Sequence, residues 1–144
     1  MIVLDAYALV ALLAAEPAGT EVKALLESEQ CAVSVLNLSE AADVLQRTHD
    51  IDVTLTRGVV STFTGSSLAV VEMDERCGWR AAELRARYYR RRGSEISLAD
   101  CVLLATATPG QDAVATSDPP VTRVAGAEGI EVVPLPDRRG HRPA

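Results

Sequence analysis

Short apolar runs alternate with helix-forming stretches along most of the chain. Runs typical of buried strands cover residues 1–4, 31–35, 68–72, 113–116 and 130–134. Stretches with the composition and spacing of helices lie between most of them, at residues 6–15, 20–29, 37–47, 53–64, 74–92 and 97–108. This alternation predicts an α/β fold in which a central, mostly parallel sheet of about five short strands is covered by helices on both faces.

The ends of these elements carry recognisable signals. Thr20, Asn37 and Ser97 are predicted helix N-caps, and Gly93 is the predicted end of the long helix over residues 74–92. The segment 117–120, Ser-Asp-Pro-Pro, predicts a turn between the last two strands. We find no internal repeat and no linker, so residues 1–135 are expected to form one domain. The tail over residues 136–144, rich in Pro and Arg, is expected to be flexible.

Composition supports a single globular domain and limits its surroundings. The chain has 144 residues, of which 48% are apolar, and a formal charge of -6, which argues against nonspecific adhesion to nucleic acid. The longest apolar run, residues 6–15, is shorter than the roughly 20 residues that span a bilayer, and Asp5 stands where a secretory leader carries a basic residue. We therefore expect a cytoplasmic protein that does not contact membranes. The three cysteines form no CxxC pair and are expected to be reduced.

Missing motifs exclude several enzyme classes. The chain has no GxxxxGK, GxGxxG or GxSxG sequence, so nucleotide-binding loops and the hydrolase nucleophile elbow are not supported. Its two histidines, His49 and His141, lie at the end of a predicted helix and in the tail. A histidine-based triad or zinc site is therefore disfavoured, which leaves the carboxylates as candidate functional groups.

Four carboxylates stand where the predicted sheet ends. Asp5 directly follows the first strand and Asp118 follows the 113–116 strand by two residues, so in a parallel sheet both emerge at the same edge. Glu40 and Asp100 lie in the first turns of helices that begin near that edge. Taken singly, the spacings Asn37-x-x-Glu40 and Ser97-x-x-Asp100 equally suggest capping boxes, and aspartates after strands are common turn formers.

Taken together, the four acids suggest a cation site. Two carboxylates about 4 Å apart repel by roughly 4 kcal/mol at an effective dielectric near 20, so a cluster requires a positive charge. Oxygen ligands without His or Cys favour Mg²⁺ or Mn²⁺, and such a cluster is a common setting for hydrolysis of phosphodiesters. A nuclease or a phosphatase is therefore indicated. Phosphoryl transfer to Asp5 is disfavoured, because Tyr7 replaces the expected second acid and the only lysine, Lys23, lies beyond the first helix.

Four segments that contain these acids resemble those of a known family. The segments IVLDAYALV at 2–10, VLNLSEA at 35–41, ISLADCVLLATA at 96–107 and ATSD at 115–118 are similar, in this order, to those of the PIN-domain ribonucleases. The short length and the final GIEVVP segment at 129–134 resemble the VapC toxins of bacterial toxin-antitoxin pairs. The resemblance covers essentially the whole chain.

The resemblance implies a three-layer α/β/α PIN-like fold and a Mg²⁺- or Mn²⁺-dependent endoribonuclease. It implies that Asp5, Glu40, Asp100 and Asp118 bind the metal and that Thr116 lies beside them in the catalytic site. It also implies an RNA substrate, a cognate antitoxin as partner, and a homodimer. Tyr7 and Pro119-Pro120 depart from the family pattern. The alternative is a catalytically inactive module of the same fold that acts through a partner complex.

A strongly basic segment precedes Asp100. Seven of the thirteen arginines lie between residues 76 and 92, with Glu83 as the only acid among them. On a helix, Arg76, Arg80, Arg87 and Arg91 share one face, and Trp79, Ala82, Ala86 and Tyr89 share a face that is expected to pack in the core. We interpret Arg80, Arg87 and Arg91 as candidate contacts to RNA phosphates, with Tyr88 as a candidate for base stacking. A contact with the antitoxin and a solvated helix face are the alternatives.

Overall fold

The computed structural model describes residues 1–90 and 96–144, and its centre is a five-stranded sheet in which all neighbouring strands are parallel. The order is β3-β2-β1-β4-β5. The strands are β1 (Ile2–Leu4), β2 (Cys31–Ser34), β3 (Leu68–Val71), β4 (Ala113–Thr116) and β5 (Glu131–Pro134). The predicted α/β fold with a parallel sheet is therefore confirmed.

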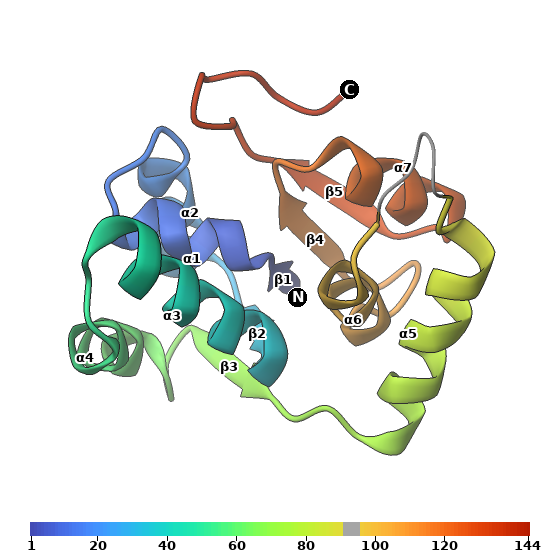
Figure 1. Ribbon diagram of the computed structural model, residues 1–144, viewed down its shortest axis with the longest axis horizontal. Coiled ribbons are helices and arrows are strands. Elements are labelled where there is room, and N and C mark those ends of the chain that lie inside the picture. The colour runs from blue at the N-terminus through green and yellow to red at the C-terminus, as the bar shows by residue number, and fades with distance from the viewer. Residues whose placement is uncertain (91–95) are drawn as a thin grey trace.

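Helices cover both faces of this sheet. The helices are α1 (Ala6–Leu13), α2 (Gly19–Ser28), α3 (Val35–His49), α4 (Val53–Phe63), α5 (Glu75–Tyr88), α6 (Leu98–Thr106) and α7 (Pro119–Ala127). Figure 1 shows α1 to α4 on one side of the strands and α5 to α7 on the other. Each side has its own apolar core, one around Leu9, Leu45 and Leu68 and the other around Leu84, Leu103 and Val124. The chain thus has the three layers of an α/β/α protein.

The central strand β1 fixes where the site can form. It pairs with β2 on one side, with Ile2 opposite Cys31, and with β4 on the other, with Leu4 opposite Ala115. Because all three strands run in the same direction, their carboxyl ends lie at one edge of the sheet. The residues that follow β1 and β4 are therefore neighbours in space.

Helix starts depart from the sequence prediction at two positions. Helix α3 begins at Val35 instead of Asn37, because the Ser34 hydroxyl accepts the Asn37 N–H at 3.0 Å and acts as the N-cap. Helix α2 begins at Gly19 without a side-chain cap, so Thr20 lies inside the helix. The predicted cap at Ser97 is confirmed, and Asp100 completes a capping box there.

Helix α7 was not predicted. It occupies the segment between β4 and β5, where the sequence suggested only a turn. Asp118 is its N-cap, and Pro119 and Pro120 occupy its first two positions. Proline is tolerated there because the N–H groups of the first turn have no partner within the helix. The proline pair therefore starts a helix at this point.

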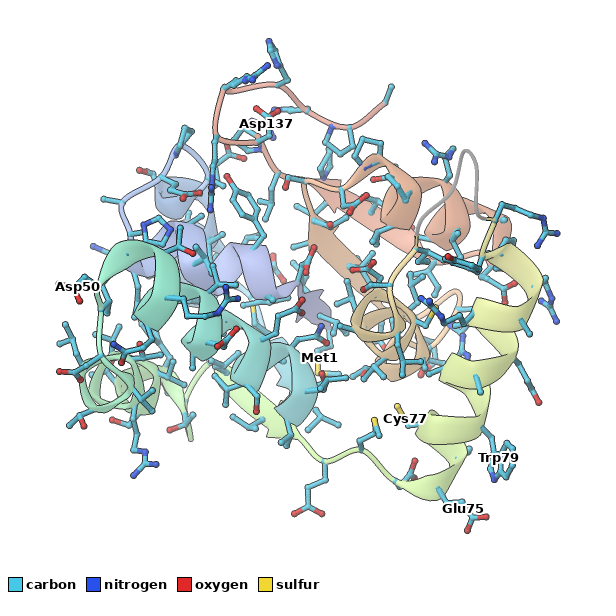
Figure 2. All side chains as sticks on the ribbon, in the orientation of Figure 1. Met1, Asp50, Glu75, Cys77, Trp79 and Asp137 are labelled. Carbon is cyan, nitrogen blue, oxygen red and sulfur yellow. The ribbon has the colours of Figure 1, made fainter. Side chains whose placement is uncertain are left out.

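The packing face of α5 also differs from the expected one. Ala81 and Leu84 are buried, whereas Trp79 is 66% exposed and Tyr89 lies beyond the end of the helix. Figure 2 shows Trp79 pointing away from the rest of the molecule. Assigning Trp79 and Tyr89 to the core was therefore wrong, and Ala82 and Ala86 of the same expected face are exposed as well. The helix packs through a different face, which carries the aliphatic residues Ala81 and Leu84. The helix also ends at Tyr88, before Arg90, and residues 91–95 lie outside the described part of the chain.

Two simpler expectations can be checked directly. Cys31, Cys77 and Cys101 are free thiols, as expected, and burial raises the pKa of Cys31 and of Cys101 to about 11. Within residues 1–90 and 96–144, no helix has the length and apolar character needed to cross a membrane.

Candidate active site

The four acids singled out in the sequence lie around one cavity. Asp5, Glu40, Asp100 and Asp118 line a cavity of about 290 Å³ at the carboxyl edge of the sheet. They come from the ends of β1 and β4 and from the early turns of α3 and α6. The structure therefore brings together side chains that are up to 113 positions apart in the sequence.

Asp5 is the most buried of these acids. Only 7% of the residue is exposed, and its Oδ2 accepts a hydrogen bond from the Thr116 hydroxyl at 2.6 Å. Although Asp5 occupies the N-cap position of α1, its side chain makes no capping hydrogen bond. Burial raises the pKa of Asp5 to about 7, and the nearby carboxylates of Asp100, Glu40 and Asp118 add to the increase. Its environment thus disfavours the charged form unless a cation is present.

Thr116 connects two of the acids. It is fully buried at the end of β4, and its Oγ1 accepts the backbone N–H of Asp118 at 3.1 Å while donating to Asp5. This hydrogen bond lowers the pKa of Asp5, against the effect of burial. The structure therefore places Thr116 beside Asp5 and Asp118, where it orients the Asp5 carboxylate.

Glu40 lies in the second turn of α3, because that helix starts earlier than predicted. Burial and the nearby Asp100 carboxylate raise the pKa of Glu40. The proposed capping box between Asn37 and Glu40 is wrong, since Ser34 caps the helix. The buried Asn37 instead donates from Nδ2 to the Ala99 carbonyl at 3.2 Å and accepts from the Ser34 hydroxyl at 2.6 Å. It therefore links α3 to the start of α6, next to Asp100.

Asp100 and Asp118 combine two tasks. Asp100 Oδ2 accepts the Ser97 N–H at 2.6 Å as part of the capping box, while the residue also lines the cavity. Asp118 Oδ1 accepts the Val121 N–H at 3.5 Å at the start of α7. Burial and the Asp100 carboxylate raise the pKa of Asp118. For Asp100, capping and a place in the acid cluster were alternatives in the sequence, and the structure gives it both. For Asp118 the alternative was a turn, and in the structure it caps α7 while lining the cavity.

The donor set suits a hard divalent cation. Among the described residues, the cavity is lined by four carboxylates and by no histidine or cysteine. Such oxygen ligands are those preferred by Mg²⁺ and Mn²⁺. In residues 1–90 and 96–144, the side-chain hydrogen bonds of Asp5, Asp100 and Asp118 each engage one carboxylate oxygen. In that same part of the chain, no group of three or more acidic, His or Cys side chains is arranged to hold a metal as it stands. An ion would therefore have to draw the carboxylates inward.

The candidate RNA-binding residues on α5 do not line this cavity. Arg80 donates to the carbonyl of Ala107, the C-cap residue of α6, at 3.0 Å. Arg87 and the Tyr88 hydroxyl both donate to Glu128 Oε1, at 2.7 and 2.6 Å. Arg91 lies outside the described residues. The described contacts of these residues join α5 to α6 and to the end of α7, and a phosphate track along α5 remains a prediction.

Some polar residues that line the cavity were not selected from the sequence as functional. Arg138, from the tail that was expected to be flexible, lines the cavity, as does Ser117. Tyr7, noted only as a departure from the family pattern, also lines it and donates to the Pro136 carbonyl at 3.1 Å. No local signal marks Arg138, because its position depends on where the tail crosses α1.

The sequence matches the family model described as the PIN domain over residues 2–127. The chain therefore belongs to the PIN domain family, which confirms the resemblance seen in the sequence. A search of curated protein sequences gives no match.

Several solved toxin-antitoxin proteins have the same fold. A toxin-antitoxin complex from Klebsiella pneumoniae aligns with a TM-score of 0.64 and 21% identity, covering 92% of this chain and 96% of that one. VapBC2 from Rickettsia felis, bound to a promoter DNA fragment, gives 0.65 and 17%, covering 92% and 98%. VapC20 from Mycobacterium tuberculosis, described as a Sarcin-Ricin loop cleaving toxin, gives 0.57 and 18%, covering 74% and 80%. At these identities the similarity establishes a shared fold.

Proposed function

We propose that this protein is a Mg²⁺- or Mn²⁺-dependent endoribonuclease. The observation that carries the proposal is the convergence of Asp5, Glu40, Asp100 and Asp118 on one cavity. Burial and repulsion between the carboxylates raise the pKa of three of them, Asp5, Glu40 and Asp118. A bound cation would offset this repulsion and favour the charged forms. Membership of the PIN family and the fold shared with an RNA-cleaving toxin support RNA as the substrate.

The residues have distinct roles in this proposal. Asp5, Glu40 and Asp100 would hold the metal directly, and Asp118 would complete the site directly or through water. Thr116 donates to Asp5 Oδ2 and so orients the carboxylate that would bind the cation. A bound Mg²⁺ or Mn²⁺ supplies positive charge that activates water and stabilises charge developing on the phosphate. In this proposal water, rather than a side chain, would attack the phosphorus atom.

Replacing Asp100 with Asn tests this proposal. Asp100→Asn keeps an oxygen that can accept the Ser97 N–H but removes one negative charge from the cluster. We expect Mn²⁺-dependent cleavage of single-stranded RNA to fall by about 100-fold or more, in the range found when a group that stabilises the transition state is removed. Glu27→Gln removes an exposed carboxylate on α2 and serves as the charge control. Equal activity in Asp100→Asn and Glu27→Gln would contradict the assignment.

We further propose that the protein is the toxin of a toxin-antitoxin pair, inhibited by a cognate antitoxin and active as a homodimer. The toxin-antitoxin complexes among its structural neighbours support this. Expression of the protein alone should arrest bacterial growth, whereas expression of Asp100→Asn should not.

Light scattering tests the homodimer. The purified protein should give twice the mass of one chain, and a monomer would contradict the homodimer.

A catalytically inactive module of the same fold is the second candidate. It is favoured by the two departures from the family pattern, Tyr7 and Pro119-Pro120. Thermal unfolding in a Mn²⁺ titration separates the two candidates. A catalytic site predicts that Mn²⁺ raises the Tm of the wild type and raises that of Asp5→Asn much less. No Mn²⁺ response in either protein would support the inactive module.

A further inference from the structure

One basic side chain reaches the acidic cavity. Arg138 lies in the C-terminal tail, yet it lines the cavity together with Asp5, Glu40, Asp100 and Asp118. Among residues 1–90 and 96–144, no other basic residue lines it. The position is unexpected, because seven of the thirteen arginines lie between residues 76 and 92, and the described contacts of Arg80 and Arg87 lead elsewhere. The cavity therefore combines a carboxylate cluster with one guanidinium at its edge.

A buried carboxylate holds Arg138 in place. Its Nε lies 3.0 Å from Glu16 Oε1, and the Glu16 side chain is only 11% exposed. His49, at the end of α3, approaches the same Glu16 oxygen at 3.4 Å. Burial, and secondly the Glu16 carboxylate, raise the pKa of Tyr7 to about 12. Arg138 and His49, which are distant in sequence, thus meet at the same carboxylate oxygen of Glu16.

The backbone on both sides of Arg138 is also fixed. Before it, the buried Leu135 donates its N–H to the Thr116 carbonyl at 2.9 Å. After it, Asp137 accepts the N–H groups of Arg139 and His141, both at 2.8 Å. Figure 2 shows Asp137 at this bend of the tail. Further along, Arg142 makes two hydrogen bonds to Glu21 of α2, at 2.7 and 3.1 Å.

The ion pair of Arg138 is with Glu16. Within the described residues, Arg138 forms no ion pair with any of the four acids of the cavity. Its charge does act on Tyr7, at the outer side of the cavity. The guanidinium is therefore held through its Nε beside the cavity, and the Arg138 side chain remains 56% exposed.

We propose that Arg138 binds the RNA phosphate next to the cleaved bond and so positions the substrate. This inference rests on the proposed nuclease function. Four carboxylates and one divalent ion leave the cavity negative, which opposes the approach of a phosphodiester. A guanidinium at the rim supplies a positive charge and paired N–H donors that match phosphate oxygens. The tail thus completes the substrate site of the domain.

The test compares Arg138→Gln with Arg139→Gln. Both variants remove one positive charge at neighbouring positions, but Arg139 does not line the cavity. We expect Arg138→Gln to lower kcat/KM for Mn²⁺-dependent RNA cleavage by about tenfold or more, chiefly through KM. The slope of log(kcat/KM) against log[KCl] should become shallower by about 0.7, the change expected for one lost contact to a single-stranded phosphate. Arg139→Gln should leave both quantities unchanged.

Two further variants separate substrate binding from a purely structural role. Arg138→Lys keeps the charge and should retain the salt slope while raising KM, since it cannot donate from a guanidinium fork. The Mn²⁺-induced rise in Tm should be the same in Arg138→Gln and wild type, because Arg138 does not hold the metal. Unchanged KM and salt slope in Arg138→Gln would overturn the inference while leaving the nuclease function standing. Absence of metal-dependent RNA cleavage in the wild type would overturn both.

Discussion

Asp5 has the most unfavourable environment for a charge among the four acids. It is buried between β1 and α1, and its carboxylate has the Thr116 hydroxyl as its hydrogen-bond donor. Its pKa of about 7 is well above the ordinary value of 3.8. The folded protein thus holds a proton on Asp5 at pH values where the unfolded chain has released it. Stability therefore falls as the pH rises from about 4 to 7, and the full cost of ionised Asp5 is reached above 7.

Asp5→Asn should remove this cost. In metal-free protein, the Tm of Asp5→Asn should exceed that of wild type by an amount that grows between pH 4 and 7 and then levels off. At pH 8 we expect a difference of at least about 3 °C, the shift that about 1 kcal/mol produces in a chain of this size. Thermal unfolding followed by circular dichroism in a pH series measures it. A difference that is independent of pH would show that Asp5 titrates normally.

Asn37 is a second residue whose role depends on burial. Replacing it with Leu removes the hydrogen bonds to Ser34 and Ala99 and leaves buried polar groups without partners. We expect Asn37→Leu to lower the free energy of unfolding by about 1–3 kcal/mol. Ser39→Ala on the same helix removes an exposed hydroxyl bonded to Val35 and should cost less than about 0.5 kcal/mol. Urea denaturation of the two variants measures the difference, and equal values would contradict a linking role for Asn37.

At the scale of elements, the contact between α1 and α2 depends on a glycine. A Cβ atom at Gly19 would lie 2.5 Å from the Ala11 carbonyl oxygen and 3.2 Å from its carbon. Because both are backbone atoms, Gly19→Ala must push the two helices apart. We expect a loss of about 1–3 kcal/mol in the free energy of unfolding.

Gly58 provides the matched control. It lies within α4 and has no heavy atom within 4 Å of the position of a Cβ. Gly58→Ala should therefore stabilise the protein by about 0.5–1 kcal/mol, the usual gain of alanine over glycine in a helix. Urea denaturation of Gly19→Ala and Gly58→Ala should give changes of opposite sign, and a neutral Gly19→Ala would refute the close approach.

At the scale of the whole molecule, the C-terminal tail connects the two ends of the chain. Composition predicts a flexible tail, whereas the structure contains ion pairs from Arg138 to Glu16 and from Arg142 to Glu21. In Figure 1 the tail runs past α1 and α2. These contacts join the tail to the layer formed by α1 to α4, on the side of the sheet that carries Tyr7.

Limited trypsin digestion measures whether these contacts order the tail. We expect slow cleavage after Arg138 and Arg139 in the wild type, because a protease needs a locally unfolded segment, whereas Arg142 precedes Pro143 and is not a trypsin site. Combining Glu16→Gln with Glu21→Gln removes both ion pairs and should accelerate cleavage several-fold. Mass spectrometry identifies the cut sites. Equally rapid cleavage in both proteins would support the flexible tail that the composition predicts.

Much of the architecture could be predicted because its signals are local. The strands are short apolar runs, and Ser97 with Asp100 forms the capping box that the spacing indicated. Helix α7 was missed because Pro119-Pro120 was taken for a turn, although proline also begins helices. The exposed face of α5 was misassigned because periodicity defines faces but does not say which one meets the core. Trp79 is the clearest example.

The sequence by itself determined the order along the chain of the strands and of every described helix except α7, and it placed the four acids at the carboxyl edge of the sheet. These follow from side-chain chemistry within a few residues and from the single edge that parallel strands share. Three features were decided only by the tertiary structure. These are the burial that raises the pKa of Asp5, the hydrogen bond from Asn37 to the Ala99 carbonyl at the start of α6, and the position of Arg138 beside the cavity. Each of these depends on contacts between distant segments, which local propensity does not encode because they form only when the layers pack.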